Sequence, residues 1–430
     1  MLAADAPASP TIDLDTIRCQ FPALADTDNG VARIYFDNPA GTQVPQQVAD
    51  STTDCLLHAN ANYGGYFRTS LRATAIVEES RAAMADFLNA PSPDEIIFGQ
   101  SMTSLTMHVS RSIGQHFQAG DEIIVSQMDH DANIAPWLLM ARDHELKVRW
   151  LPFNTESYEF ELETLDSLLN DSTKLVCIGG ASNLTGTIND VDTICAKARE
   201  AGAWTFIDAV QSAPHVVTDV QAIGCDFLAC SAYKFFGPHQ GILWGRRDVL
   251  ERLEPYRVRP APELIPGCFE TGTLNHEGMA GTTAAVDYFA WIGETLAGCE
   301  ATDDDHSART QHVHAAMHYF FAHEKILAAR LVEGLQSLRG VIIRGITDPD
   351  AMDRRVSTVS FTHDKATPDS IAEALAARNI FVWNGHNYAL EVAKALGILE
   401  SGATVRVGAV HYNSAEEVDS LLNALEDILN

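Results

Sequence analysis

The residues with the clearest chemical potential lie in a short loop, Ser231-Ala232-Tyr233-Lys234-Phe235-Phe236-Gly237-Pro238. About two dozen residues before the lysine, a strand-like run ends in Asp208-Ala209-Val210-Gln211. A lysine in apolar, aromatic surroundings has a lowered pKa, and its neutral amine can condense with an aldehyde as a Schiff base. An acid at a strand end can pair with a pyridinium nitrogen and keep it protonated. Together these residues are what a pyridoxal 5'-phosphate site needs.

Three further motifs follow predicted strands, where the ligands of open α/β sheets gather. Ser101, Met102 and Thr103 open a helix, and their backbone N–H groups and hydroxyls suit a phosphate. His130 could lie flat on a cofactor ring. Asn183, in a turn that contains Gly186, could bond a substrate carboxylate or the ring hydroxyl.

Each of these residues taken alone also has an ordinary structural interpretation. Ser101 is suited to cap a helix, and His130 to lie in a surface loop. Asn183 fits plain turn chemistry, Asp208 a turn or helix cap, and Lys234 a surface charge. The joint order of phosphate loop, histidine, Asn turn, Asp-x-x-Gln and lysine favours a site over coincidence.

The elements that must position these residues alternate between strand and helix signals. Such alternation predicts an α/β fold with a mostly parallel sheet that is covered on both faces. The helical stretches include 76–88 and 191–201. The strand-like runs are 94–98, 121–126, 147–151, 174–178, 204–207, 227–230 and 241–244.

The 430 residues are enough for two sizeable cores. We expect an N-terminal arm at 1–30 with a short helix near 13–21, a large cofactor-binding domain at 31–300 and a small domain at 301–430. Asp303-Asp304-Asp305 predicts a solvated break, and a long helix follows at 306–338. The small domain reads as α+β, with strands near 356–361, 380–383 and 404–407 and a helix at 415–429.

The formal net charge is −29, which disfavours nucleic acid and anionic membranes as partners. Apolar runs are too short to span a bilayer and no secretory signal is visible, so we expect a cytoplasmic protein. The eight cysteines form no Cys-x-x-Cys pair and no Cys/His cluster with zinc-ligand spacing, so no metal site is expected. None lies beyond Cys299.

From about Ile34 to the C-terminus the chain resembles a class V aminotransferase-type enzyme of the fold-type I pyridoxal phosphate superfamily. Within that superfamily it is most similar to the cysteine desulfurase and selenocysteine lyase group. The resemblance implies a large domain with a seven-stranded sheet. The motifs that carry it are Tyr35 to Gly41, Met128-Asp129-His130, Ser182-Asn183-x-x-Gly186-Thr187, Asp208-Ala-Val-Gln211, the Lys234 loop, Phe269 to Asn275, and Val405 to Asn413.

The resemblance implies a role for each matched residue. Lys234 would form the Schiff base, His130 would stack on the ring and Asp208 would pair with the pyridinium nitrogen. Thr273 would reach the phosphate of a neighbouring subunit, which implies a homodimer with composite sites, and Arg406 would grip the substrate α-carboxylate. The other implied contacts are Gln211 to the ring hydroxyl, Ser231 to the phosphate, and Gly41 and Asn183 to the substrate.

The chain departs from the desulfurase pattern where that family reads Arg-x-Gly-His-His-Cys-Ala. Here Trp383 to Ala389 reads WNGHNYA, so that Tyr388 replaces the nucleophilic cysteine and Trp383 replaces an arginine. A phenol cannot take up sulfur as a persulfide, and no later cysteine can substitute. Tyr233 also replaces the histidine before the lysine. We therefore expect Tyr388 to contact substrate and no desulfuration through a persulfide.

The expected function is that of a lyase acting at the β-carbon of an amino acid substrate. The reaction would be β-elimination or β-decarboxylation, with addition to an aldehyde as a variant. Transamination, epimerisation and desulfuration by an unusual route remain alternatives. Outside enzymes, an inactive pyridoxal phosphate scaffold remains open, although Lys234, Asp208 and Arg406 argue against it.

Overall fold

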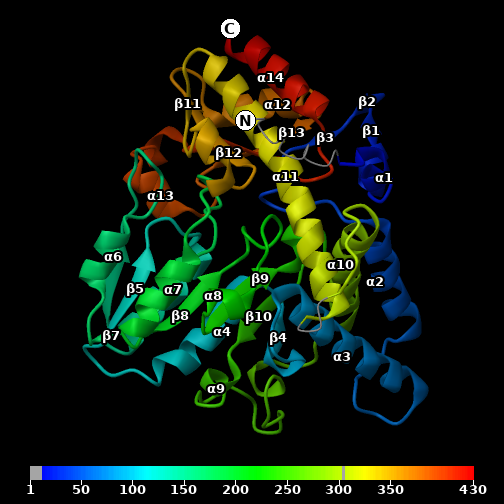
Figure 1. Cartoon of the computed structure of the whole chain (residues 1–430), viewed down its shortest axis with the longest axis vertical. Coiled ribbons are helices and arrows are strands. Elements are labelled where there is room, and N and C mark those ends of the chain that lie inside the picture. Colours follow the sequence, from blue (N-terminus) through cyan, green and yellow to red (C-terminus); the bar gives the residue numbers. More distant parts are fainter. Residues whose placement is uncertain (1–11, 303–305) are drawn as a thin grey trace, which may run out of the picture.

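The structure is a computed structural model that describes residues 12–302 and 306–430. The expected solvated break at Asp303 to Asp305 and the first residues of the expected arm lie outside the described residues. The described chain forms a large lower unit and a smaller upper unit in the view of Figure 1.

A seven-stranded sheet forms the centre of the large unit, as the sequence predicts. Every strand runs in the same direction except β10, which pairs antiparallel with both of its neighbours. The carboxyl ends of the parallel strands therefore meet at one edge. In spatial order the strands are β4 (Ile96–Gly99), β10 (Gly241–Gly245), β9 (Phe227–Ser231), β8 (Trp204–Asp208), β7 (Thr173–Gly179), β5 (Glu122–Ser126) and β6 (Lys147–Leu151).

Apolar side chains on both faces bury this sheet, which explains its nearly continuous hydrophobic strands. Successive residues alternate between two cores: Ile96 and Phe98 face one, and Ile97 faces the other. The first core lies under α3 (Arg68–Leu88), α7 (Val191–Glu200) and α10 (His276–Thr295). The second lies under α4 (Met102–Gly114), α5 (Ala135–Asp143) and α9 (Arg247–Leu250). Helix α2 (Gln46–His58) packs outside α10.

The upper unit is built on a four-stranded antiparallel sheet. Its order is β11 (Val341–Ile343), β12 (Thr358–His363), β15 (Thr404–Gly408) and β14 (Trp383–Gly385). Helices α12 (Pro368–Ala376) and α14 (Ala415–Leu429) cover it and enclose a separate apolar core. Helix α13 (Leu390–Ala395) follows β14.

Helix α11 (Ala308–Ser337) belongs to both units. Val313 and Phe320 in its first half pack into the core of the large unit, whereas Leu327 and Leu335 pack into the core of the small one. Figure 1 shows this helix running from beside α10 up to the C-terminal elements. The domain limits predicted from the sequence stay a prediction, because one helix spans both cores.

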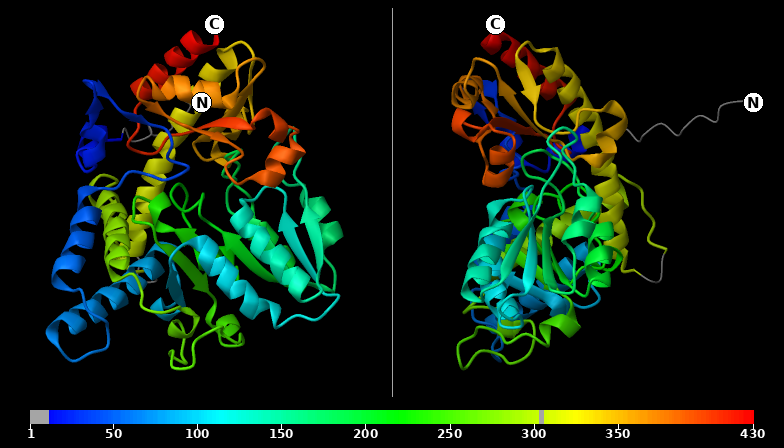
Figure 2. Two further views of the ribbon diagram at one scale, coloured as in Figure 1. Left: turned by 180° about the vertical axis from the view of Figure 1, so that it is seen from behind. Right: turned by 90° about the vertical axis from the view of Figure 1, so that its left-hand side faces the viewer.

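The N-terminal elements lie beside the upper unit in both views of Figure 2. They are α1 (Leu14–Arg18), β1 (Thr27–Asp28), β2 (Val31–Ala32) and β3 (Ile34–Tyr35). Strand β3 pairs in parallel with β13 (Ile380–Phe381) of the upper unit. The start of the described chain is thus tied to its last third.

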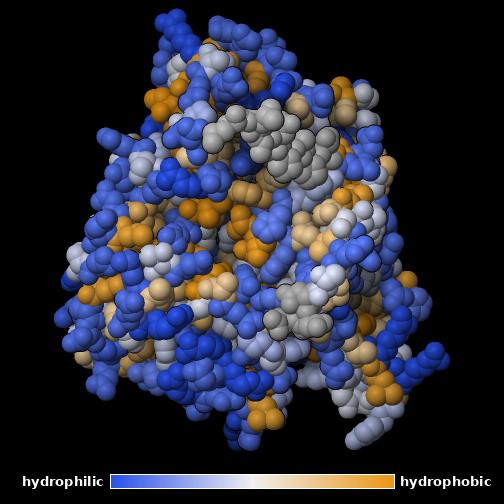
Figure 3. Space-filling view, viewed as in Figure 1, coloured by the Kyte–Doolittle hydropathy of each residue, from blue (hydrophilic) through white to orange (hydrophobic). Residues whose placement is uncertain are grey.

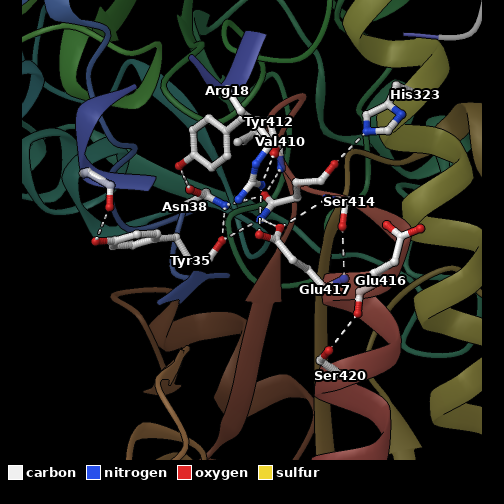
Figure 4. A network of polar contacts seen from close by, with 12 residues as sticks. Arg18, Tyr35, Asn38, His323, Val410, Tyr412, Ser414, Glu416, Glu417 and Ser420 are labelled. Carbon is white, nitrogen blue, oxygen red and sulfur yellow. Dashed lines mark hydrogen bonds and ion pairs between the residues drawn. The ribbon is translucent and has the colours of Figure 1, made fainter. Parts of the chain in front are cut away.

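Asn38 is the centre of a buried polar network that fixes the loop after β3 (Figure 4). Its side-chain amide donates to the carbonyls of Tyr35 and Gly408 at 2.9 and 2.7 Å, and its amide oxygen accepts from the Tyr412 hydroxyl. Arg18 donates to the Tyr412 carbonyl and to Glu417 at 2.8 and 2.9 Å. Because buried polar groups that lose a partner are costly, this network holds the loop in one place.

Hydrophilic residues cover most of the face seen in Figure 3, as the large negative charge of the chain requires. In the described part of the chain, no helix is long and apolar enough to cross a membrane. The described residues also contain no group of His, Cys, Asp or Glu side chains that could hold a metal ion.

Candidate active site

A cavity of about 670 Å³ lies where the carboxyl ends of β5, β7, β8 and β9 face strands β14 and β15 of the upper sheet. It brings together most of the predicted site residues, although their positions are spread over three hundred residues of sequence. The predicted residues that line it are Ser101, Met102, Thr103, His130, Asn183, Asp208, Gln211, Ser231, Lys234, Tyr388 and Arg406.

Two predicted residues do not line the cavity. Gly41 lies behind it, where a Cβ atom would come within 3.2 Å of the Tyr233 ring. Thr273 is exposed, in the loop before α10. The roles predicted for both residues stay predictions.

Lys234 ends a short 3₁₀ turn after β9, and the buried rings of Phe235 and Phe236 follow it. Its side chain is only 9% exposed. Burial, with a smaller contribution from the Arg406 charge, lowers the pKa of the Lys234 amine to about 7. The Nζ atom donates to the carbonyls of Pro39 and, at 3.1 Å, Ala40. A neutral amine satisfies both carbonyls with its two hydrogens and keeps a lone pair for chemistry.

Asp208 is the last residue of β8 and is buried at the floor of the cavity. Burial raises the pKa of its carboxyl to about 6, against a hydrogen bond from the Val210 N–H at 2.9 Å and the attraction of Lys234. Asp208 is therefore mostly ionised at neutral pH and suited to face a cation. Gln211, three residues further in the turn after β8, donates from Nε2 to the Thr358 hydroxyl at 3.0 Å.

His130 follows β5 and forms one wall of the cavity. Burial, assisted by the charges of Lys234 and Arg406, lowers the pKa of its ring to about 4, so the ring is neutral. Its Nδ1 accepts from the Ala132 N–H at 3.0 Å, which leaves the proton on Nε2. The ring stacks on Tyr388 with centroids 5.3 Å apart and planes 23° apart. A neutral, flat ring fixed in this way suits stacking better than charge pairing.

The N-terminus of α4 opens into the same cavity. Ser101 caps the helix, because its hydroxyl accepts from the Ser104 N–H at 3.1 Å. The structural interpretation of Ser101 is thus correct for its side chain. The N–H groups of the first turn have no acceptor within the helix and carry the positive end of its dipole. Ser231 from β9 lines the cavity as well, and the combination suits a phosphate.

Arg406 lies on β15 and is buried. Burial lowers the pKa of its guanidinium to about 10, so it keeps its charge at neutral pH. Its Nη1 donates to the Asn183 carbonyl at 2.8 Å, while the Asn183 Nδ2 donates to the Asn387 carbonyl at 2.7 Å. The two residues predicted to bind the substrate carboxylate therefore contact each other.

Asp129 lines the cavity, although the sequence analysis gave it no role. Its carboxylate accepts from the Gly179 N–H at 2.9 Å and from the Asn133 amide at 2.8 Å. Burial raises the pKa of this carboxyl to about 7. A signal was present in the sequence, because Asp129 follows β5 closely in the way that Asp208 ends β8.

The rim of the cavity is formed by residues 383–388, which comprise β14 and the loop after it. Of these rim residues, only Tyr388 was predicted from the sequence as a site residue. Trp383, Asn384, Gly385, His386 and Asn387 line the cavity as well. No cysteine lines the cavity among the residues that the structure describes.

The donors and acceptors present fit pyridoxal phosphate. Asn183 Oδ1, Gln211 Oε1 and Arg406 Nε are buried and have no hydrogen-bond partner in the described part of the chain. All three side chains line this cavity, together with a helix N-terminus, an amine and a carboxylate. Buried polar groups without partners are rare unless a ligand completes them. Lys234, Asp208 and the first turn of α4 would hold the group.

The chain matches the family described as Aminotransferase class-V over residues 34–421. It is 32% identical to a probable cysteine desulfurase of Streptomyces coelicolor, over 97% of this chain and 98% of that protein. An apo cysteine desulfurase from Thermococcus onnurineus is 29% identical and superimposes with a TM-score of 0.85, covering 98% of this chain and 99% of the other. The cysteine desulfurase CsdA of Escherichia coli is 27% identical, with a TM-score of 0.82 over 97% and 99%.

Proposed function

Because this chain belongs to the class V aminotransferase family of pyridoxal phosphate enzymes, we propose that it is a lyase that breaks a bond to the β-carbon of an amino acid. The proposal excludes desulfuration through a protein persulfide. The observation that carries it is the composition of the cavity. A buried lysine, carboxylate and arginine are present, and Tyr388 stands where the resembled desulfurase pattern has its cysteine.

When bound, pyridoxal phosphate withdraws electrons from the α-carbon of an attached amino acid. The residues of this chain then decide which bond breaks. Arg406 would hold the α-carboxylate through its free Nε, and Asp208 would keep the ring nitrogen protonated. With its pKa near 7, Lys234 can take the α-proton on Nζ and return it elsewhere on the substrate.

In β-elimination, the α-proton moves to Lys234 and the leaving group departs from the β-carbon with its bonding electrons and a proton. Water then releases the remainder as a 2-oxo acid and ammonia, and for a cysteine derivative that acid is pyruvate. No oxidant or reductant is needed. The step requires no thiol in the protein, in keeping with a cavity wall that carries Tyr388.

Cysteine with a thiol reductant separates this function from that of the relatives. The proposal expects sulfide with pyruvate and ammonia, and no persulfide on the protein, as measured by mass spectrometry of products and peptides. Rapid formation of alanine, with a persulfide on Cys268 or another cysteine, would show desulfuration instead. If no amino acid is turned over, the protein is a binding scaffold and not an enzyme.

The proposal includes a homodimer with composite sites. Arg81 of α3 forms a bidentate ion pair with Glu270 at 2.9 Å, which anchors the loop that carries Thr273 and leaves that residue exposed. Tyr66 and Phe67, in the segment before α3, are 99% and 61% exposed. Exposed apolar residues of this size favour a protein partner. A fully active monomer in sedimentation experiments would contradict this part of the proposal.

A further inference from the structure

Two large aromatic side chains at the rim of the cavity are exposed. Trp383 is 49% exposed and Tyr388 is 67% exposed. Exposed aromatic side chains that line a cavity are the usual means of binding a flat or apolar ligand. A ligand that covers these rings removes their apolar area from water.

The backbone at Tyr388 has an uncommon conformation that hydrogen bonds hold in place. Asn387 and Tyr388 have φ angles of 48° and 60°, in the left-handed region that non-glycine residues rarely adopt. Hydrogen bonds fix the loop: Asp131 N–H donates to the Tyr388 carbonyl at 2.8 Å, Tyr388 N–H to His386 Nδ1 at 3.1 Å, and Asn183 Nδ2 to the Asn387 carbonyl at 2.7 Å. Backbone strain that is held by surrounding bonds is characteristic of functional positions.

Trp383 is placed by the register of the upper sheet. It is the direct antiparallel partner of Arg406 across β14 and β15. Side chains of directly opposed residues lie on the same face of a sheet, within contact distance. A substrate whose α-carboxylate is bound by Arg406 therefore has Trp383 beside it, while Tyr388 extends the stack that begins at His130.

The charges of the cavity are confined to its floor. Asp129, Asp208, Lys234 and Arg406 are all buried, whereas the cavity-lining residues 383–388 of the rim carry no carboxylate, ammonium or guanidinium group and have the His386 imidazole as their only titratable side chain apart from the Tyr388 phenol. Behind the rim, Asn384 donates to the carboxylate of Asp369. A substrate side chain that ends in a carboxylate would meet only the His386 imidazole as a partner at the rim and would lie near the carboxylate of Asp369.

We propose that the substrate carries a neutral, flat group beyond its β-carbon, such as an aromatic ring attached through a thioether, and that Trp383 and Tyr388 bind this group by stacking. The inference rests on the proposed function, because the β-substituent is the leaving group of the same reaction. It makes the rim the part of the site that determines specificity.

Four cysteine thioethers test the inference, because they share the atom that leaves and differ only in the tail. They are S-benzyl-, S-methyl-, S-carboxymethyl- and S-aminoethyl-cysteine. The holoenzyme is titrated with each, and Kd from the cofactor spectrum and kcat/KM from pyruvate release are measured. We expect S-benzyl-cysteine to exceed S-methyl-cysteine by about tenfold or more in kcat/KM, and the two charged tails to be weaker still.

Variants at the rim connect the preference to these side chains. Trp383→Leu and Tyr388→Leu should each reduce the ratio of kcat/KM between the benzyl and methyl substrates about fivefold. Tyr256→Leu, at an exposed tyrosine outside the cavity, is the matched control and should leave that ratio unchanged.

The outcomes separate this inference from the proposed function. Turnover with a preference for the methyl or either charged tail overturns the inference and leaves the lyase activity standing. A benzyl preference that survives both leucine variants also overturns it. No spectral change and no pyruvate with any substrate overturns both proposals.

Discussion

The floor and the rim of the cavity are made of different kinds of residue. Lys234, Asp208 and Arg406 at the floor are buried and ionisable, and their motifs resemble the cysteine desulfurase pattern. Trp383 and Tyr388 at the rim are exposed and neutral, and both depart from that pattern. Under the proposed function, the floor would hold the cofactor and the α-amino acid group common to all substrates, whereas the rim would contact the part that differs between substrates.

Removing the amine of the floor should have the largest effect. Lys234→Ala should lower kcat by about 10⁴-fold, because the same Nζ binds the cofactor and moves the α-proton. Borohydride treatment of the wild-type protein should fix the cofactor to the peptide that contains Lys234, as measured by peptide mass spectrometry. Lys365→Ala, at an exposed lysine, is the control. Attachment to any other peptide would remove Lys234 from the site.

The acid of the floor should come next. Asp208→Asn should keep bound cofactor and lose about 10³-fold in kcat, since an amide cannot keep the ring nitrogen protonated. Steady-state kinetics with cofactor content measured on the same sample tests this. An Asn variant that works at near wild-type rate would show that Asp208 does not pair with the ring.

Changing the rim toward the family pattern should redirect the reaction without altering the floor. Tyr388→Cys should raise alanine formation from cysteine roughly tenfold over the wild-type background, because a thiolate is then available as a nucleophile. The double variant with Trp383→Arg should raise it further. Alanine and pyruvate are quantified together, with Tyr388→Ser as the control without a thiol. Equal alanine formation by the Tyr388→Cys and Tyr388→Ser variants would contradict the claim that the side chain at this rim position determines the reaction.

The smallest expected effect concerns the pH at which the Lys234 amine becomes reactive. Only the unprotonated amine can attack an aldehyde, so cofactor uptake by apoenzyme should rise about tenfold per pH unit below the Lys234 pKa near 7 and level off above it. Arg406→Gln removes a cation that lowers this pKa and should move the midpoint upward by about half a unit or more. Stopped-flow absorbance measures both. A midpoint that stays near pH 10 would show that Lys234 is not buried as described.

The sequence was most informative where local signals decide the structure. Strand β6 and helix α14 begin and end at the predicted residues, because alternation of polar and apolar residues defines the strand and an amphipathic pattern defines the helix. The floor was also predicted from the sequence, since Asp208 ends β8 and Lys234 follows β9 of one sheet, while Arg406 lies on a strand signal near the C-terminus. Trp383 was noted as a departure but not as a site residue, because its place beside Arg406 depends on the register between β14 and β15. Asp129 was missed because its burial follows from tertiary packing with β7.

Helix α11 has a consequence for how the protein unfolds. Its two halves complete two different hydrophobic cores, so neither core can lose its order without exposing half of a helix that the other core needs. The free energies of unfolding of the two units are therefore coupled through one continuous α-helix. We expect the two units to unfold in one cooperative transition on heating. The cavity between them should then persist until α11 unfolds.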